Sequence, residues 1–322
     1  MDSHTTLDEL DHRLIHALQL DARAPFSRIA VVLGVSDQTI ARRYRRLRTT
    51  NALRVVAVPD ARQPGHVEWL VRIQCAPAAA AGMAAGLARR SDVSWVTITS
   101  GGAEITCIAR TRSQRHSDDL FLQKLSRTPR LVSITAHRLL RYLVGVGGWS
   151  ARTSALTPDQ VAALTPVRAA TRPIEPSEAD ERLIRALARD ARADYRTLVT
   201  ASGYPESTVR RRIDQLLDSG AMYYDVDLDP AALGYEIEAM LWLTISPAQL
   251  GEMASALRTH TEIAFAAATT GPTNVVAFTA ARDADALFDY LATDLGALPG
   301  LQRVETAPIM RTVKRAGATF LP

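Results

Sequence analysis

The sequence predicts an α+β protein in which two winged helix-turn-helix domains alternate with two ferredoxin-like domains of the order β-α-β-β-α-β. Three observations lead to this prediction. One long segment of the chain occurs twice at a constant spacing. Each copy begins with three short stretches whose apolar residues recur at helical spacing. Each copy then continues with stretches that alternate apolar and polar residues, the pattern of half-buried strands.

The internal repeat organises the whole chain. The segment Leu10–Leu47 aligns with Ala179–Leu216 at a constant shift of 169 residues (179 − 10). Matched pairs in this register include Asp11 and Asp180, Leu18 and Leu187, Gly34 and Gly203, Thr39 and Thr208, and Leu47 and Leu216. The similarity continues at a shift of about 170, where Pro77 matches Pro247. The chain is therefore a tandem duplication.

The duplication predicts four domains and one linker. The helix-turn-helix domains are residues 1–60 and 177–230, the ferredoxin-like domains are residues 64–146 and 234–317, and the linker is residues 147–176. Within the linker, Thr157, Pro158 and Gln160 have the order of a helix start, with an N-cap, a proline in the first turn and a capping-box residue. We therefore expect a short helix in an otherwise extended connector.

The composition excludes several classes of protein. The chain has 322 residues and a formal net charge of +4, and nearly all of its basic residues are arginine. Cys75 and Cys107 are the only cysteines and the seven histidines show no metal-ligand spacing, so we expect no disulfide framework, metal or other cofactor. No apolar run approaches the roughly 20 residues that cross a bilayer, and the first residues lack a secretory pattern. We therefore expect a cytoplasmic protein with no membrane partner.

The first module of copy one is predicted to form three helices, Leu7–Leu20, Phe26–Leu33 and Asp37–Arg48. Gly34 is suited to a left-handed turn after the second helix, and Ser36 is suited to cap the third. The turn is too short for anything but a tight crossing, which indicates a helix-turn-helix. Short strands, a small wing or a lead-in to the next domain, are expected after the third helix of each copy, at Leu53–Val58 and Met222–Leu228.

The outward face of the third helix is rich in arginine and begins with Gln and Thr. Arginine neutralises phosphates or binds guanine through two hydrogen bonds, and Gln pairs with adenine. This face therefore predicts a contact with the major groove of double-stranded DNA. The predicted contacts are Ser36, Gln38, Thr39, Arg42, Arg45 and Arg46 in copy one, and Ser207, Thr208, Arg210 and Arg211 in copy two. Arg43 lies on the inward side and is predicted to form a structural ion pair.

The arginine-rich face also fits two simpler interpretations. An isolated arginine cluster is often only a solvated surface, and a GC-rich genome also favours arginine codons. The position of the cluster on the third helix favours the DNA contact. Because the third helix of copy two mixes arginines with Glu206 and Asp214, we expect copy one to bind more tightly and the operator to be an imperfect palindrome.

The second module of each copy predicts a ferredoxin-like sheet. In copy one the expected strands are Val67–Cys75, Val93–Thr99, Glu104–Ala109 and Leu131–Tyr142, and the expected helices are Pro77–Arg89 and Ser117–Ser126. Helices cover one face of such a sheet, so the other face has to pack on a second sheet. We expect Trp69, Val71 and Ile73 to face their counterparts in copy two within the same chain.

Several short motifs occur here in a fixed order. They are Leu7-Asp8, Asp11, Leu14, Leu18, Asp21 and Arg23 in the first helices, then Gly34, Ser36, Arg42 and Arg43, then the loops Ser100-Gly101 and Thr270-Gly271, and last Pro299-Gly300-Leu301. In this order they resemble the Lrp/AsnC family of bacterial transcriptional regulators, duplicated in one chain. The resemblance implies a homo-oligomer, assembled through its second module, that binds an amino acid or related metabolite there and adjusts transcription.

The glycine loops of the second module are candidates for the effector site, because glycine lets backbone amides approach a carboxylate and Glu104 can hold an amine. The candidate residues are Ser100, Gly101, Gly102, Glu104, Thr270, Gly271 and Asn274. A plain hairpin turn accounts for the glycines equally well. Two features depart from the family pattern. Glu104 and Asn274 stand where the family usually carries Asp, and Pro205 replaces the capping Ser36 in copy two.

Two further functions are open from the sequence. Some sirohaem-type tetrapyrrole decarboxylases resemble this family, including fused two-copy forms, and use His and Arg rather than a metal. The Cys-Tyr-x-Arg stretch that we associate with them is absent from Val93 to Gly101, so we assign no catalytic residue and expect no enzyme. A low-specificity, nucleoid-associated architectural protein would share the DNA contacts and show little sequence preference.

Overall fold

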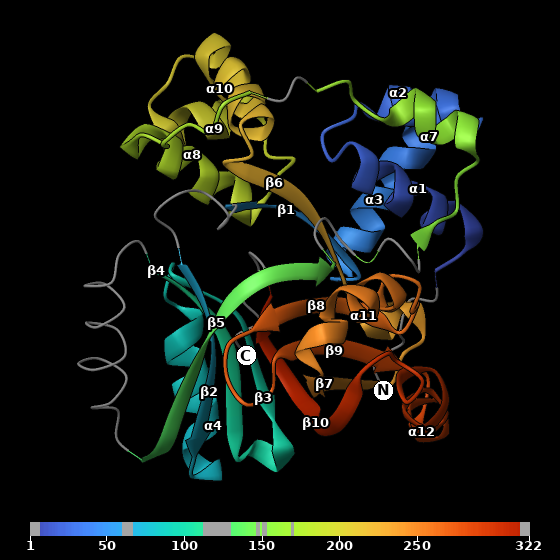
Figure 1. Cartoon of the computed structure of the whole chain (residues 1–322). Coiled ribbons are helices and arrows are strands. Elements are labelled where there is room, and N and C mark those ends of the chain that lie inside the picture. The colour runs from blue at the N-terminus through green and yellow to red at the C-terminus, as the bar shows by residue number, and fades with distance from the viewer. Residues whose placement is uncertain are drawn as a thin grey trace. The chain divides into compact units, whose positions relative to one another are not determined.

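A computed structural model describes residues 7–59, 67–111, 130–145, 149, 153–168 and 171–315 (Figure 1). The chain divides into two compact units, which are described separately. The helical unit comprises residues 7–59 together with the described part of 149–233, and the barrel unit comprises the described part of 67–145 together with 234–315. The helix predicted at Ser117–Ser126 lies outside the described residues.

The helical unit contains two three-helix modules, one from each copy. Copy one forms α1 (Glu9–Leu20), α2 (Phe26–Leu33) and α3 (Asp37–Thr49), and copy two forms α8 (Glu178–Arg189), α9 (Tyr195–Ser202) and α10 (Glu206–Asp218). Gly34 ends α2 at φ 71° and Gly203 ends α9 at φ 80°. Both angles are left-handed, which glycine adopts without steric cost, so the next helix crosses at once. The predicted helix-turn-helix is confirmed in both copies.

The same apolar positions form the core of each module. Leu14, Leu18, Ile40 and Leu47 are fully buried in copy one, and the equivalent Leu183, Leu187, Val209 and Leu216 are fully buried in copy two. Burying one such side chain contributes about 1.5 to 3 kcal/mol relative to exposure. The spacing of these residues therefore fixes which face of each third helix points inward and which remains outside.

The strands after the third helices pair with each other and do not form separate wings. β1 (Leu53–Pro59) and β6 (Met222–Leu228) make a two-stranded antiparallel ribbon (Figure 1). Val56 pairs with Asp225 at its centre, and these two residues are equivalent in the repeat (225 − 56 = 169). Equivalent positions of the two copies thus pair at the centre of the ribbon, so the ribbon has the two-fold symmetry of the repeat. It joins the two helix-turn-helix modules within one chain.

The predicted linker helix exists but packs on copy one. It is α7 (Pro158–Leu164), with the capping box between Thr157 and Gln160 that the sequence predicts. Leu164 is fully buried in the core of copy one. Gln160 also donates a hydrogen bond to the Val32 carbonyl at 3.1 Å. This part of the linker is therefore a fourth helix of the first module.

His16 on α1 fixes the chain just before α7. Its Nδ1 accepts hydrogen bonds from the backbone amides of Ala155 and Leu156, each at 3.1 Å. Burial lowers the pKa of His16 below its ordinary value of 6.5. The neutral ring is therefore the form that holds the segment, because a protonated Nδ1 cannot accept a hydrogen bond.

The barrel unit is one closed sheet built from both copies. Copy one forms β2 (Val67–Cys75), α4 (Pro77–Ala88), β3 (Val93–Thr99), η1 (Ser100–Gly102), β4 (Glu104–Thr111) and β5 (Leu131–Val144). Copy two forms β7 (Ile237–Ile245), α11 (Leu250–Leu257), β8 (Ile263–Thr269), β9 (Val275–Ala281), α12 (Ala284–Tyr290), the π-helical turn η5 (Leu291–Leu295) and β10 (Leu301–Lys314). The strand order around the barrel is β10-β3-β4-β2-β5-β8-β9-β7.

The two long strands close the barrel. β5 pairs with β2 of its own copy and with β8 of the other, and β10 pairs with β7 of its own copy and with β3 of the other. The registers match, because Leu139 pairs with Thr269 where the equivalent Ile309 pairs with Thr99. The expectation that the two sheets meet within one chain is confirmed.

The predicted residues of that contact were wrong, by one position along the strand. Val71 and Ile73 lie in the core beneath α4, outside the barrel wall, and Trp69 packs against the same core. Leu70 points inward with Trp242, and both are nearly completely buried. Successive side chains of a strand point to opposite faces, so an error of one residue exchanges the two faces.

We predict that acid loosens the segment before α7. The pKa of His16 is lower folded than unfolded, so its contribution to stability is present above pH 6.5 and is lost as pH falls from there toward the lowered value. Protection of the Ala155 and Leu156 amides against hydrogen exchange should therefore fall as the pH is lowered below 6.5. In His16→Gln, whose amide does not titrate, protection should not change with pH. Equal pH dependence in both proteins would contradict the assignment.

Candidate functional site

The outward faces of α3 and α10 form the first candidate site. Gln38, Arg42 and Arg45 on α3 are exposed, as are Ser207 and Arg211 on α10. Within the described part of the chain, the side chains of Arg42, Arg45 and Arg211 have no hydrogen-bond or ion-pair partner. These guanidinium groups are therefore available to an external anion.

The remaining predicted DNA contacts have local roles. The Ser36 hydroxyl caps α3 by accepting a hydrogen bond from the Thr39 amide at 3.1 Å. Thr39 and the equivalent Thr208 lie in the first turns of α3 and α10, and Pro205, which stands in place of Ser36 in copy two, provides no side-chain cap. Arg210 donates to Glu206 at 2.7 Å and stacks over the Tyr195 ring at 3.6 Å. Arg210 is thus less free than the arginines of α3.

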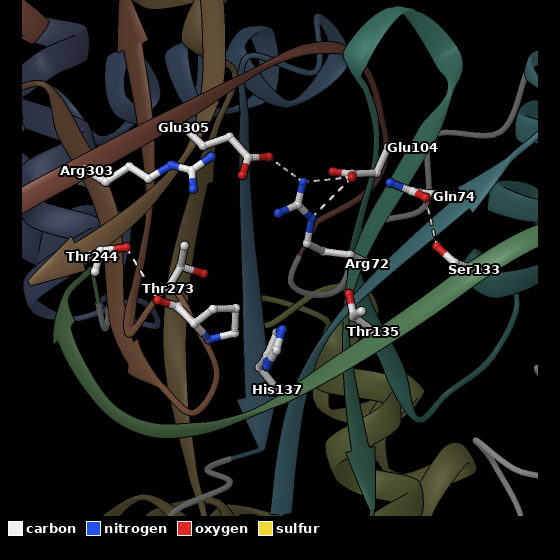
Figure 2. Close-up of a pocket in the computed structure, with 11 residues that line it drawn as sticks. Arg72, Gln74, Glu104, Ser133, Thr135, His137, Thr244, Thr273, Arg303 and Glu305 are labelled. Atoms are coloured by element: carbon white, nitrogen blue, oxygen red, sulfur yellow. Dashed lines mark hydrogen bonds and ion pairs between the residues drawn. The ribbon is translucent and has the colours of Figure 1, made fainter.

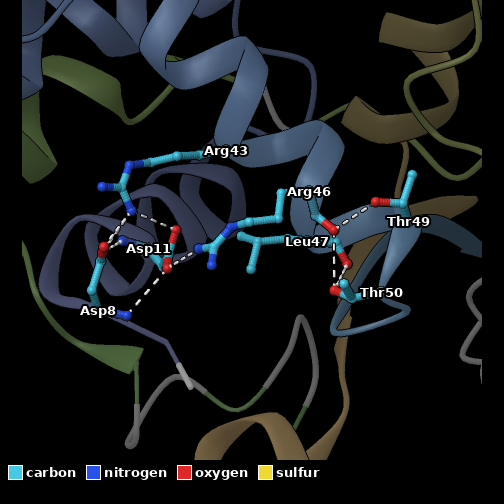
Figure 3. Close-up of polar contacts among 7 residues, drawn as sticks. All are labelled: Asp8, Asp11, Arg43, Arg46, Leu47, Thr49 and Thr50. Carbon is cyan, nitrogen blue, oxygen red and sulfur yellow. Dashed lines mark hydrogen bonds and ion pairs between the residues drawn. The ribbon is translucent and has the colours of Figure 1, made fainter. Parts of the chain in front are cut away.

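A buried carboxylate orders the inner arginines of α3 (Figure 3). Asp11 is fully buried and binds Arg43 at 3.0 Å and also Arg46. Arg43 also pairs with Asp8 at 2.6 Å, which lowers the pKa of that carboxyl. The structural ion pair predicted for Arg43 is confirmed. Arg46, predicted as a DNA contact, forms an ion pair with Asp11, and its side chain stays partly exposed.

Copy two repeats this ion pair. Asp180 is fully buried and binds the Arg212 Nε at 2.8 Å. Burial by itself would raise the pKa of Asp180, but hydrogen bonds from Arg212 and Ser177 outweigh it and hold the pKa below its ordinary value of 3.8. A charged carboxylate therefore connects the first and third helices in each module.

The two third helices differ strongly in charge. α3 carries five arginines and one aspartate, a net charge of +4 (5 − 1), whereas α10 carries three arginines and three acidic residues, a net charge of zero (3 − 3). Asp214 occupies the position that Arg45 holds in copy one (214 − 45 = 169). Phosphate binding depends on neutralising charge. The two faces are therefore unequal as DNA-binding surfaces.

The second candidate site is a cavity of about 370 Å³ inside the barrel unit (Figure 2). Both copies contribute to its lining, which consists of Arg72, Gln74, Glu104, Ser133, Thr135, His137, Thr244, Pro272, Thr273, Arg303 and Glu305. The volume has room for roughly a dozen water molecules. It lies at the lower end of the range of about 300 to 1,000 Å³ that holds small ligands.

An ion-pair network crosses the cavity. Arg72 donates to Glu104 at 2.8 Å and to Glu305 at 2.6 Å, and its guanidinium stacks on the Trp242 ring at 4.0 Å. Arg72 and Trp242 are equivalent positions of the two copies (242 − 72 = 170). The cavity is therefore asymmetric at its centre, although the strands around it are symmetric.

Two charged groups remain available at the cavity. The side chain of Glu305 is 40% exposed although it pairs with Arg72, whereas that of Glu104 is 6% exposed. Arg303 lies beside Glu305 on β10, and its side chain forms no hydrogen bond or ion pair with any described residue. Burial, together with the charge of Arg72, lowers the pKa of His137, so its ring is neutral near pH 7. Among its described residues, the cavity thus presents the unpaired guanidinium of Arg303, the accessible carboxylate of Glu305 and neutral polar groups.

Of the residues proposed for the effector site, Glu104 is the one that lines this cavity. Ser100, Gly101 and Gly102 form the tight turn η1 and do not line it. The Asn274 side chain both accepts from and donates to the Ile245 backbone at 2.8 Å. Thr270 is bonded to the backbone of Arg138.

Gly271, also predicted for the effector site, packs against a residue that lines the cavity. Its φ is +106°, and a Cβ atom there would lie 2.2 Å from the His137 ring. The glycine therefore leaves the space that His137 occupies at the cavity. A side chain at this position would displace His137, so the packing at the cavity requires glycine here.

The sequence pattern did not reveal most of the lining. The signal was present as polar residues at every second position of three strands, namely Arg72 and Gln74, Ser133, Thr135 and His137, and Arg303 and Glu305. Alternation in a strand usually indicates a solvent face. Here the same face lines the cavity, at which Gln74, Thr135 and Arg303 remain exposed. Among the described residues, no group of three His, Cys, Asp or Glu could hold a metal, and no helix is long and apolar enough to cross a membrane.

Three family models match the sequence. The AsnC-type helix-turn-helix domain matches residues 7–48, a winged helix-turn-helix DNA-binding model matches residues 176–221, and the Lrp/AsnC ligand binding domain matches residues 238–319. The HTH-type transcriptional regulator FL11 of Pyrococcus horikoshii is 30% identical over 146 residues, which are 45% of this chain and 95% of that protein. Ptr1 of Methanocaldococcus jannaschii, also an HTH-type transcriptional regulator, is 29% identical over 136 residues, 42% of this chain and 92% of that protein.

A solved structure resembles the fused chain over its length. The siroheme decarboxylase NirDL has a TM-score of 0.61 and 12% identity, covering 96% of this chain and 93% of that chain. At this identity the likeness shows the fold alone. The paired helix-turn-helix modules and the regulator relatives define the class of protein, an HTH-type transcriptional regulator. The chain belongs to the Lrp/AsnC family and carries two copies of its unit.

We predict that Asp180→Asn destabilises the second module without changing the DNA sequence that the protein prefers. The expected loss is roughly 2 to 3 kcal/mol, below the range for a fully buried pair because Arg212 keeps some solvent contact. Chemical denaturation measures it, with the exposed Asp214→Asn as the matched control, for which we expect less than about 0.5 kcal/mol. In the wild type this contribution is present above pH 3.8 and is lost as the pH falls through the lowered pKa. Equal stability of the two variants would contradict a structural role.

Proposed function

We propose that this chain binds, as a single-chain pseudo-dimer, an operator with two unequal half-sites. One observation carries the proposal. The symmetric ribbon of β1 and β6 joins two helix-turn-helix modules whose third helices have net charges of +4 and zero. Two-fold helix-turn-helix proteins read half-sites about one turn, or roughly 34 Å, apart. The ribbon supplies the pairing that other such proteins obtain from a second chain.

The two modules have separate tasks in this proposal. In copy one, Gln38, Arg42 and Arg45 are exposed and able to reach base edges or phosphates. In copy two, Arg211 is the exposed arginine equivalent to Arg42, while Asp214 repels the DNA phosphates. Copy one therefore supplies most of the affinity and the salt dependence. Copy two adds the second half-site.

We also propose that the barrel cavity binds the effector, a zwitterionic amino acid with a neutral polar side chain. Arg303 suits its carboxylate and Glu305 suits its ammonium group. The cavity contains two arginines and two glutamates besides the neutral His137, so a zwitterion leaves the charge balanced. The other polar lining groups are uncharged, which favours a side chain with an amide or a hydroxyl.

The asymmetry of the cavity implies one effector per chain. Arg72, Glu104 and His137 are replaced at the equivalent positions of copy two by Trp242, Asn274 and Ala307. An equivalent second site would lack these groups. Calorimetry should therefore give a stoichiometry of one.

Tetrapyrrole decarboxylation remains the second candidate, because the fold likeness to NirDL covers both copies. The cavity volume of about 370 Å³ suits an amino acid better than a tetrapyrrole. Titration with a tetrapyrrole, followed by its visible absorption, separates the two candidates. A stable complex with turnover would replace the effector proposal.

We predict that Arg42→Ala weakens binding to the selected operator by about 1 to 3 kcal/mol if this residue reads a base. The equivalent Arg211→Ala should cost less, because α10 contributes less affinity. Sites selected from random DNA should form an imperfect palindrome, and both variants are then compared on that operator at fixed salt. Equal losses, or a perfectly symmetric operator, would argue against unequal half-sites. Binding without sequence preference would favour an architectural protein.

We predict that Arg303→Ala weakens binding of L-glutamine about 10-fold to 100-fold, because one charge-assisted hydrogen-bonding partner is lost. Arg311→Ala is the matched control, since Arg311 is exposed on the same strand and does not line the cavity. Calorimetry with L-glutamine, L-serine and L-leucine measures affinity and stoichiometry. Tighter binding of L-leucine than of the polar amino acids would refute the proposed specificity.

A further inference from the structure

The loops between the first and second helices of the two modules carry the same four residues. They are Asp21-Ala22-Arg23-Ala24 in copy one and Asp190-Ala191-Arg192-Ala193 in copy two. In each loop the aspartate accepts a hydrogen bond from the arginine's own amide, at 3.1 Å in copy one and 2.9 Å in copy two. Such a turn fixes the direction in which the arginine leaves the backbone.

Each arginine reaches into the other copy. Arg23 donates to the carbonyls of Ala191 and Ala193, at 2.5 and 3.2 Å. Arg192 donates to the carbonyls of Ala22 and Ala24, at 2.7 and 3.0 Å. The two sets of bonds are reciprocal under the repeat. We call them the arginine clasp.

The clasp also contacts the elements that carry the third helices. The Arg192 guanidinium lies over the Phe26 ring at 4.4 Å and over the Tyr44 ring at 5.4 Å, and Tyr44 is on α3. Arg23 lies over Tyr195 at 5.0 Å, the ring on which Arg210 of α10 stacks. Each third helix is therefore in contact, directly or through one ring, with the other copy's arginine.

The ribbon alone leaves the relative orientation of the modules poorly defined. Two-stranded ribbons vary widely in twist, because no third strand restrains them. The clasp adds a second connection next to the ribbon, where the Ala191 amide donates to the Val55 carbonyl of β1 at 2.8 Å, and each arginine bonds two carbonyls through a planar group. Together with the ion pair between Arg48 of α3 and Asp190 of the copy-two loop at 2.7 Å, the ribbon and the clasp fix both the distance and the rotation between the modules.

We infer that Arg23 and Arg192 are positioning residues that set the spacing between the two half-sites the protein accepts. The inference rests on the proposed DNA binding and adds a determinant of specificity that touches no base. Binding of both half-sites at once raises affinity about 100-fold or more over one, provided that the geometry allows it. A rigid clasp allows both half-sites to be bound at one spacing, whereas a ribbon without the clasp allows this at several spacings.

The test compares wild type with R23Q/R192Q on duplexes in which the selected half-sites are moved apart by about one to five base pairs. For wild type, an insertion of about half a turn, roughly five base pairs, should lower affinity about 100-fold. For R23Q/R192Q the same insertion should lower it less than about 10-fold, while binding to a single half-site is unchanged. The matched control is Arg182→Gln, because Arg182 donates to the Ser202 carbonyl at 3.1 Å within one module. Its spacing profile should match that of wild type.

The outcomes separate the two proposals. A wild-type chain that binds neither the operator nor a half-site defeats the proposed function. An R23Q/R192Q protein that binds and keeps the sharp wild-type profile overturns the inference and leaves the proposed function intact. If the glutamine variant does not fold, R23K/R192K provides the same comparison, since lysine keeps the charge but lacks the planar group that bonds two carbonyls. A sharp profile in that protein also overturns the inference.

Discussion

Strand edges need partners, and in this chain each copy supplies the partners for the other. The ribbon pairs β1 with β6, and the two 14-residue strands β5 and β10 each pair with their own sheet on one side and with the other copy on the opposite side. An unpaired edge leaves a row of open backbone groups and invites association with another chain. The duplication pairs both edges of every barrel strand and one edge of each ribbon strand within one molecule. Both candidate sites depend on this pairing, because one lies on the modules that the ribbon joins and the other lies within the barrel.

Equivalent residues that are identical in the two copies have mainly structural roles. Asp11 and Asp180 each bind the arginine at the same position of the third helix, and Arg23 and Arg192 bind each other's loop. A buried ion pair contributes more to a defined geometry than to net stability, since desolvation offsets much of the attraction. The ion pairs of Asp11 and Asp180 therefore hold the third helix against the first within each module, whereas the arginine clasp connects the two modules.

Equivalent residues that differ occur at the candidate sites. Arg45 corresponds to Asp214 on the third helices, and Arg72 corresponds to Trp242 at the cavity. In a symmetric dimer of identical chains the two equivalent positions always carry the same residue, because one mutation changes both. Fusion of the copies allows one module to bind DNA more tightly and one composite cavity to form. The pattern of identity and difference thus follows the division between scaffold and site.

The sequence by itself determined the duplication, the helix-turn-helix modules, the linker helix and the exposed basic face of α3. These features are local, because helical spacing, a left-handed glycine and a capping serine act within a few residues. Only the tertiary structure decided that β1 pairs with β6, that polar residues such as Arg303 and Glu305 face a cavity, and that Arg23 reaches the other copy. Alternation shows that a strand has two faces but not which of them is enclosed, since closure depends on pairing between residues far apart in the chain.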